Sequence, residues 1–193
     1  MNHARIDGRW VDCDGYGLCR YEPPSSNELA TMCRQMLSAL AHIHELSVAH
    51  RDIKPANWLI DGKSFAPVLK LTDFGLAADF IPGQPLQDTC GSFLYMAPEV
   101  FQGSYTELCD LWSLGLVCHE MVWGKPLFAK LSESCVRARV CEGSLSFDEP
   151  WCCKWLKALV RQLLLKEVEG RPSALQALEN PKLQPKGCLC SVS

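Results

Sequence analysis

The stretch His50-Arg51-Asp52-Ile53-Lys54-Pro55-Ala56-Asn57 decides the fold, because it fits the pattern H-R-D-x-x-x-x-N at every fixed position. Two shorter motifs follow it along the chain. Asp73-Phe74-Gly75 comes directly after a predicted strand, and Ala97-Pro98-Glu99 closes a long segment without hydrophobic periodicity. Each tripeptide alone occurs often by chance. All three motifs in this order and at this spacing form a highly specific pattern.

Together the three motifs resemble the catalytic half of a eukaryotic protein kinase of the Ser/Thr-specific type. The resemblance runs from about Glu28 to about Leu178, which is most of the chain. It implies an α+β, mainly α-helical fold, namely the large C-terminal lobe of a kinase with a small β-hairpin. It also implies ATP and Mg²⁺ as cofactors, and transfer of a phosphoryl group to Ser or Thr of a protein substrate.

Hydrophobic spacing outside the motifs also predicts a mainly helical chain. After the breaker cluster Pro23–Asn27, apolar residues recur three or four positions apart, which predicts an amphipathic helix over residues 28–46. Residues 110–123 are apolar nearly all round and predict a buried central helix. Residues 155–164 predict another amphipathic helix, and Ser173 is a predicted N-cap for a last short helix.

A small hairpin and a long loop complete the predicted organisation. The apolar runs 58–60 and 68–71, with the turn signal Asp61-Gly62-Lys63 between them, predict an antiparallel hairpin. Residues 79–98 predict a long irregular segment, and such segments within compact domains are usually functional. The predicted boundaries are an irregular N-terminal segment at 1–27, the kinase-like lobe at 28–180 and a tail at 181–193.

The resemblance assigns chemistry to five residues. Asp52 would accept the proton of the substrate hydroxyl, and Lys54 would steady the transferring phosphate. Asn57 and Asp73 would supply the hard oxygen ligands that Mg²⁺ prefers. Leu59 would form the apolar floor under the adenine ring.

Three further residues match structural positions of the family. From the central helix, Asp110 would hold the backbone of the catalytic loop, which is the stretch of residues 50–57 quoted above. Glu99 and Arg171 would form a buried ion pair that ties the end of the long segment to the helical body. Breaking such a pair strands a buried charge, so we expect Arg171→Ala to unfold or aggregate the chain.

The activation segment, residues 73–99, departs from the family pattern. Asp88 stands where the family often has a phosphorylatable Thr, so its carboxylate could pair with Arg51 and partly imitate a phosphate. Alternatively, Asp88 is a solvated loop carboxylate, and Thr89 is an alternative phosphorylation site. Ser92 matches the hydroxyl residue that contacts the catalytic Asp and Lys. Phe93 replaces the Pro that usually follows, so the substrate-docking surface differs from the family's.

The parts of a kinase small lobe are missing before the first motif. Only residues 1–27 precede the first predicted helix, too few for five strands and a helix, and Lys54 is the first lysine. We therefore expect the N-terminal lobe to be absent, and this chain alone to transfer phosphate slowly or not at all. Two hypotheses follow. In the first, the chain is part of an active Ser/Thr kinase: a truncated gene model, a fragment, or one product whose small lobe comes from elsewhere, so that a small-lobe or regulatory protein is an expected partner. In the second, it is a non-catalytic, pseudokinase-like binding or regulatory module. In either case Leu59 meets water, which favours a partner or self-association.

Composition excludes several classes of protein. The chain has 193 residues, 48% hydrophobic and 21% charged, with a net charge of −3. These values indicate one globular domain, at most two, and give no sign of a nucleic-acid partner. The first residues contain no apolar run, so we expect no secretory signal there, and no uninterrupted apolar stretch of the sequence is long enough to span a membrane. We expect a cytoplasmic protein.

Cysteine is frequent, with twelve residues, yet no C-x-x-C pair suggests zinc. In a reducing compartment most of them are expected to be small buried residues. The end Cys190-Ser191-Val192-Ser193 fits the C-a-a-X pattern of farnesylation, and Cys188 could carry an acyl chain. Against lipidation, Ser191 is not aliphatic and the segment before it is poorly basic. Membrane association is expected only if Cys190 is prenylated.

Overall fold

The computed structural model describes residues 24–61, 68–143, 145 and 153–184, and its elements confirm the predicted α+β, mainly helical fold. Six α-helices and four short strands lie within this part of the chain: α1 Ser26–Glu45, β1 Val48–Ala49, β2 Trp58–Asp61, β3 Val68–Leu71, β4 Ala78–Asp79, α2 Pro98–Gln102, α3 Cys109–Trp123, α4 Glu133–Cys141, α5 Lys154–Leu163 and α6 Ala174–Leu178. Single 3₁₀ turns occur at Pro55–Asn57, Phe74–Leu76 and Val168–Gly170.

Helix α1 begins inside the predicted breaker cluster, two residues before the expected start. Ser25 is the N-cap: its hydroxyl accepts from the Glu28 backbone N–H, and the Glu28 carboxylate accepts from the Ser25 backbone N–H. This reciprocal capping satisfies two backbone donors that would otherwise lack partners, so the helix starts as soon as the prolines end.

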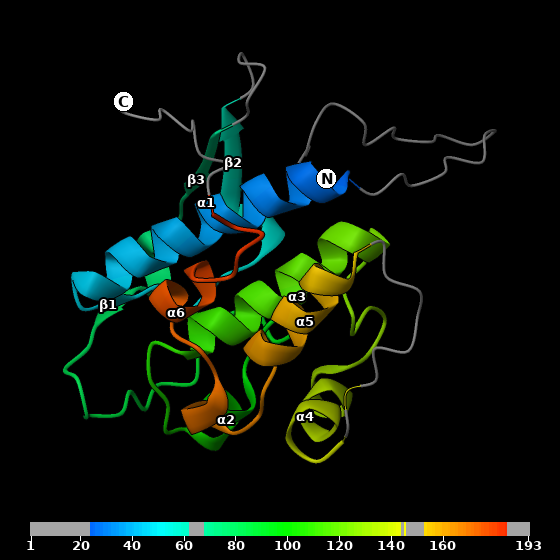
Figure 1. Ribbon diagram of the computed structural model, residues 1–193. Coiled ribbons are helices and arrows are strands. Elements are labelled where there is room, and N and C mark those ends of the chain that lie inside the picture. The colour runs from blue at the N-terminus through cyan, green and yellow to red at the C-terminus, as the bar shows by residue number, and fades with distance from the viewer. Residues whose placement is uncertain (1–23, 62–67, 144, 146–152, 185–193) are drawn as a thin grey trace, which may run out of the picture.

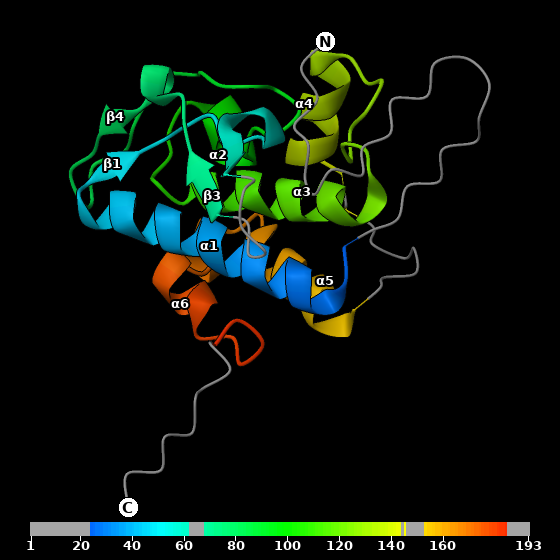
Figure 2. The same cartoon turned by 90° about the horizontal axis from the view of Figure 1, so that it is seen from above.

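Helix α3 forms the centre of the helical body. It lies between α1 and the α2 region, with α5 packed along it (Figures 1 and 2). Leu111, Trp112 and Leu114 are fully buried there, as expected for a helix that is apolar all round. The predicted helix at 155–164 is α5, and Ser173 caps α6 as predicted.

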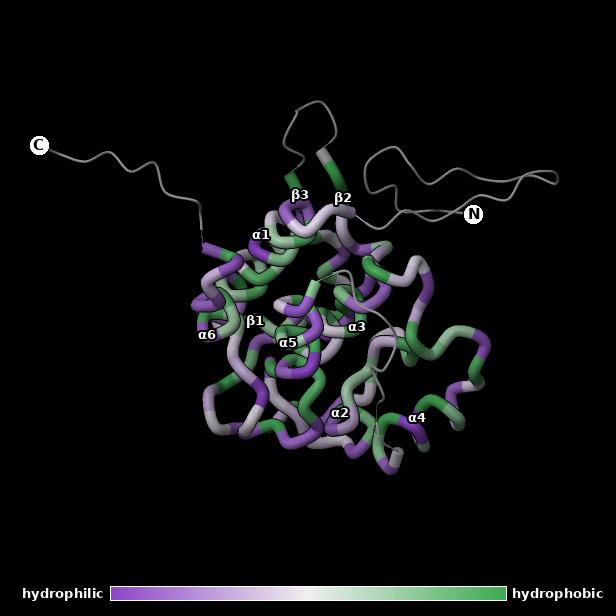
Figure 3. The backbone as a smooth tube through the Cα atoms, turned by 45° about the vertical axis from the view of Figure 1, so that its right-hand side comes forward, coloured by the Kyte–Doolittle hydropathy of each residue, from purple (hydrophilic) through white to green (hydrophobic). Residues whose placement is uncertain are grey.

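The hairpin of β2 and β3 stands out from this body, as Figures 1 and 3 show. Its strands pair antiparallel with Trp58 opposite Leu71 and Asp61 opposite Val68, which confirms the predicted hairpin. Leu69 faces the core, and its backbone N–H donates to the Gln35 side chain of α1 at 2.7 Å. The predicted turn at Asp61-Gly62-Lys63 falls largely outside the described residues.

Two features were not predicted correctly, and one residue of the predicted tail packs on the core. Strands β1 and β4 pair antiparallel, which places a short strand at the start of the segment expected to be irregular. Helix α4 was missed because its amphipathic signal is weak: only Val136 and Val140 are buried. Leu183, assigned to the tail, is buried at 2% exposure.

The cysteines are less buried than expected. Of the seven in the described ranges, all have free thiols and only Cys33, Cys109 and Cys118 are buried. Within these described ranges, no three His, Cys, Asp or Glu side chains are grouped so that they could hold a metal ion. No helix in the described part of the chain has the length and apolar character needed to cross a membrane.

Candidate active site

The open end of the hairpin brings two of the three motifs together. Asn57 directly precedes β2 and Thr72 directly follows β3, so the strand pairing places them side by side. The Thr72 backbone N–H and hydroxyl both donate to the Asn57 carbonyl, at 2.9 and 3.1 Å. Asp73 is the next residue, and thus the predicted Mg²⁺ ligands Asn57 and Asp73 lie at one end of one hairpin.

Asp52 is the centre of a polar cluster in the catalytic loop. Lys54 Nζ donates to Asp52 Oδ2 at 2.6 Å and to the Ser92 hydroxyl at 3.0 Å. The Ser92 backbone N–H donates to Asp52 Oδ1 at 2.9 Å. The structure therefore brings Asp52, Lys54 and Ser92 into the contacts that the sequence predicted, although Ser92 is far from the loop in sequence.

These contacts set the charge of Asp52. Burial by itself raises the pKa of this carboxyl, but hydrogen bonds from Lys54 and Ser92 outweigh it and hold the pKa below its ordinary value. Asp52 is consequently a carboxylate at neutral pH. Because Asp52 is only 7% exposed, its carboxylate is oriented by hydrogen bonds from protein groups and not by bulk water.

Asn57 and Asp73 have oxygens that fit a hard cation. The Asn57 amide nitrogen donates to the Asp52 carbonyl at 2.8 Å and to Asp52 Oδ2 at 3.3 Å, which leaves the amide oxygen as an acceptor. Asp73 is exposed, has a left-handed backbone at φ 62°, and makes one long bond of 3.4 Å with the Gly75 N–H. One amide oxygen and one carboxylate suit Mg²⁺, which usually keeps waters and substrate phosphates as its other ligands.

Asp110 holds the backbone of the catalytic loop from helix α3, as predicted. Its carboxylate, completely buried on α3, accepts from the backbone N–H groups of His50 and Arg51, both at 2.8 Å. His44 Nε2 of α1 lies 3.0 Å from the same carboxylate, a partner that the motif pattern did not reveal. Arg51 has a positive φ of 67°, a strained conformation that these bonds help to maintain.

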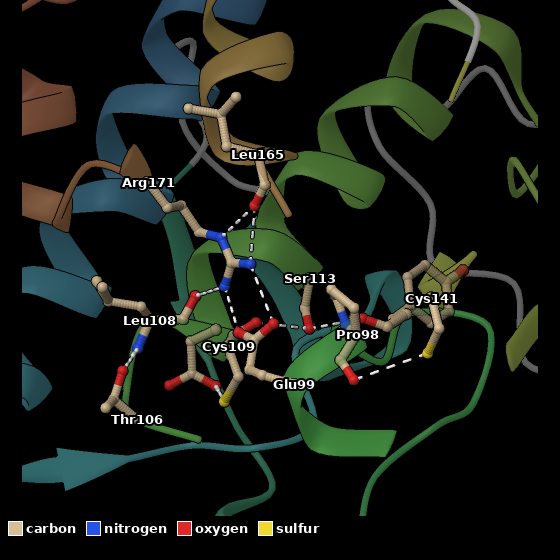
Figure 4. Close-up of polar contacts among 11 residues, drawn as sticks. Pro98, Glu99, Thr106, Leu108, Cys109, Ser113, Cys141, Leu165 and Arg171 are labelled. Carbon is tan, nitrogen blue, oxygen red and sulfur yellow. Dashed lines mark hydrogen bonds and ion pairs between the residues drawn. The ribbon is translucent and has the colours of Figure 1, made fainter. Parts of the chain in front are cut away.

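The predicted pair of Glu99 and Arg171 is buried between α2 and the residues before α6 (Figure 4). Both terminal nitrogens of Arg171 donate to the Glu99 carboxylate, one of them at 3.1 Å. The guanidinium also donates to the carbonyls of Leu108 and Leu165, at 2.9 to 3.1 Å. All five of its N–H donors therefore have partners, which is the condition for burying such a charge.

The regulatory candidates Asp88 and Thr89 lie on the surface of the activation segment. Asp88 Oδ2 is 3.7 Å from Arg51 Nη1, but the Asp88 side chain is 88% exposed. The Thr89 hydroxyl makes one long bond of 3.4 Å with the Val100 carbonyl. The Arg51 guanidinium instead donates to the Leu76 carbonyl at 2.7 Å and to the Tyr105 hydroxyl at 3.2 Å.

Gly91 is a site residue that sequence reasoning missed. Its φ is +102°, and a Cβ at this position would lie 2.4 Å from the Arg51 carbonyl oxygen. Only glycine allows the activation segment to approach the catalytic loop this closely. The sequence offered one indication of this role: Gly91 directly precedes Ser92, which was predicted to contact Asp52 and Lys54.

The face of the hairpin and the start of the activation segment expose apolar side chains. Leu59 is 57% exposed, and Val68, Phe74 and Leu76 are 39–49% exposed. Leu59 thus lies on the open face where the resemblance puts the adenine floor. The lipidation candidates Cys188 and Cys190 lie outside the described residues.

Comparisons with known proteins agree with this geometry. The sequence model of the protein kinase domain matches residues 18–183. Calcium-dependent protein kinase 1 of Oryza sativa subsp. japonica and calcium-dependent protein kinase 33 of Arabidopsis thaliana are each 34% identical over 166 residues, covering 84% of this chain and 32% of the relative. Calcium-dependent protein kinase 9 of Oryza sativa subsp. japonica is 38% identical over 157 residues, covering 80% of this chain and 27% of the relative. The chain spans about a third of the length of these curated relatives, and it belongs to the protein kinase family.

Proposed function

We propose that this chain carries the catalytic and Mg²⁺-binding residues of a protein Ser/Thr kinase, which transfers the γ-phosphoryl group of ATP to a protein hydroxyl. The observation that carries the proposal is the cluster of Asp52, Lys54 and Ser92, closed by hydrogen bonds of 2.6 to 3.0 Å. A carboxylate and an ammonium are held together at a loop that also presents Asn57. This is the arrangement that phosphoryl transfer requires, because the protein's task is positioning and charge cancellation.

Each residue has a distinct task in this proposal. Asp52, a carboxylate at neutral pH, accepts a hydrogen bond from the substrate hydroxyl and takes its proton. Lys54 is held by Asp52 and Ser92 and places its positive charge beside the transferring group. Asn57 and Asp73 hold the cation by their oxygens. When bound, Mg²⁺ neutralises the developing negative charge on the phosphate oxygens.

The proposal is tested by single-turnover phosphorylation, with the purified chain in excess over radiolabelled ATP–Mg²⁺ and casein as the protein substrate. Any transfer to Ser or Thr by this chain alone is expected to be slow, and its rate should be at least about 100-fold lower for Asp52→Asn, since general-base catalysis contributes about 10²–10⁴. Asp79→Asn is the matched control, because Asp79 is an exposed carboxylate of β4. Equal labelling by the wild type and Asp52→Asn would contradict catalysis by this loop.

A second candidate function is a non-catalytic binding or regulatory module. The exposed Leu59 and Phe74 favour it, since such side chains beside a functional loop usually contact a partner. The same assay supports the kinase if it detects slow transfer that Asp52→Asn abolishes, and that result would contradict the module. A well-folded chain that transfers no label agrees with the module and also with a kinase whose small lobe comes from elsewhere, because this chain alone is expected to transfer phosphate slowly or not at all.

For cellular location, we propose the cytoplasm, with membrane association only if Cys190 is prenylated. Support comes from the C-a-a-X pattern at residues 190–193. Intact-mass measurement of the chain expressed in eukaryotic cells tests this, with Cys190→Ser as the control. A farnesyl mass increment on the wild type alone would support prenylation of Cys190, and an unmodified wild type would contradict it.

A further inference from the structure

Tyr105 lies between α2 and α3, outside the three motifs, and it contacts the activation segment through its backbone. Its N–H donates to the Leu86 carbonyl at 3.0 Å, and its carbonyl accepts from the Leu86 N–H at 2.8 Å. The residue as a whole is 2% exposed. This isolated antiparallel bridge fixes the activation segment against the helical body shortly before Asp88.

The phenol of Tyr105 makes two further hydrogen bonds to oxygen and nitrogen partners, and its oxygen also lies 4.0 Å from Cys90 Sγ. Its hydroxyl donates to the backbone carbonyl of Asp88 at 2.6 Å and accepts from Arg51 Nη1 at 3.2 Å. A phenol suits this position because one hydroxyl both donates and accepts. Burial raises the pKa of Tyr105 to about 12 despite the opposing effect of Arg51, so the hydroxyl keeps its proton at neutral pH.

Through these bonds Arg51 contacts the start of the activation segment directly and its middle through Tyr105. Its Nε donates to the Leu76 carbonyl, directly after the Asp73 motif, at 2.7 Å. Its Nη1 contacts Tyr105, which in turn holds the segment at Leu86 and Asp88. Ser92, four residues beyond Asp88, then meets Asp52.

The Asp88 carboxylate contributes much less to this arrangement. It lies 3.7 Å from Arg51 Nη1 and is 88% exposed, whereas the Arg51 side chain is 12% exposed. An ion pair of this length with one partner in solvent is weak and screened by salt. The short bond to this residue goes to its backbone carbonyl, which every substitution at position 88 retains.

We infer that Tyr105 is the positioning residue of the activation segment: its hydroxyl links Arg51 of the catalytic loop to the Asp88 backbone and thereby places Ser92 at Asp52. This deepens the proposed function and rests on it. The Asp88 side chain has a minor part in docking the segment.

Hydrogen–deuterium exchange of the full 193-residue chain, without ATP, tests the inference. Tyr105→Phe keeps the buried ring and removes only the hydroxyl, so we expect amides at residues 84–90 to exchange about tenfold faster, with α3 unchanged. Asp88→Ala keeps the backbone carbonyl, and its exchange should match the wild type. Tyr95→Phe is the matched control, because it removes a phenol hydroxyl that bonds Glu120 at 2.6 Å instead.

Each other outcome contradicts the inference. Faster exchange at residues 84–90 in Asp88→Ala but not in Tyr105→Phe would assign the docking to the carboxylate. Faster exchange in α3 as well would give Tyr105 a general role in the fold rather than a local one. Because no nucleotide is present, the result does not depend on phosphoryl transfer, so the expected exchange pattern supports the inference whether or not the phosphorylation assay supports the proposed function.

Discussion

The catalytic loop has a closed side and an open side, and the two differ in how their polar groups are satisfied. On the closed side, which faces the helical body, Asp110 is fully buried and Arg171 has a partner for every N–H donor. On the open side, Asp73 and Leu59 face solvent. The difference indicates that residues on the closed side determine the stability of the fold, whereas those on the open side are available to bind ligands. Substitutions on the two sides should therefore affect different measurements.

The largest effect on stability is expected from Arg171→Ala, on the closed side. Removing the guanidinium leaves the Glu99 carboxylate buried without its partner, which costs about 3–5 kcal/mol. Urea unfolding measures the loss directly, and aggregation of the variant at moderate temperature would agree with it. Arg161→Ala is the control, since Arg161 is an exposed residue of α5 and its loss should change the free energy of unfolding by about 0.5 kcal/mol or less. Equal stability of the two variants would remove the distinction between the sides.

A smaller effect is expected where the activation segment meets the loop. Gly91→Ala places a methyl group 2.4 Å from the Arg51 carbonyl at a φ of +102°, so steric overlap adds to backbone strain, at about 2–3 kcal/mol in total. Gly83→Ala is a matched control: its φ is +83°, but its Cβ would meet nothing within 4 Å. It should cost about 1 kcal/mol, from strain alone. If unfolding experiments give both variants the same cost, the close approach at Arg51 is not what requires glycine.

The pH dependence of stability tests the electrostatics of Asp52. Its pKa in the folded chain lies below the ordinary value of 3.8, so the carboxylate contributes stability above that value and loses it as the pH falls through the lower folded pKa. The difference in free energy of unfolding between the wild type and Asp52→Asn should be widest near neutral pH. It should shrink as the pH falls below about 5 and continue to shrink until the pH has passed the lower folded pKa. A difference that grows on acidification would show that the folded pKa is raised instead.

The motifs predicted the fold and most of the site because local sequence determines those parts. Asp52, Lys54 and Asn57 share one loop, and the hairpin that places Asp73 beside them has short strands with clear turn signals. The buried pair of Glu99 and Arg171 was predicted only through the family resemblance, since 72 positions separate them.

The missed residues depend on contacts between distant segments. His44 is one of several polar residues on a helix that was predicted from its hydrophobic spacing alone. No residue near it in the sequence indicates that its side chain contacts Asp110. Tyr105 follows the Ala97-Pro98-Glu99 motif in a stretch without periodicity, and its bond to Asp88 exists only after the segment folds back. Helix α4 has two buried residues, too few for a hydrophobic pattern.

The smallest effect is expected on the open side, from Leu59→Ala. Leu59 is 57% exposed, so truncating it should change the free energy of unfolding by about 0.5 kcal/mol or less. Leu69 provides the comparison within the same hairpin: it lies on β3, is 8% exposed and packs into the core, so Leu69→Ala should cost about 2–4 kcal/mol. Thermal and urea unfolding of the two variants measure the contrast. A leucine that contributes little to folding is available for binding. Leu59→Ala should therefore reduce self-association of the chain, measured by light scattering, while changing its stability by no more than this amount.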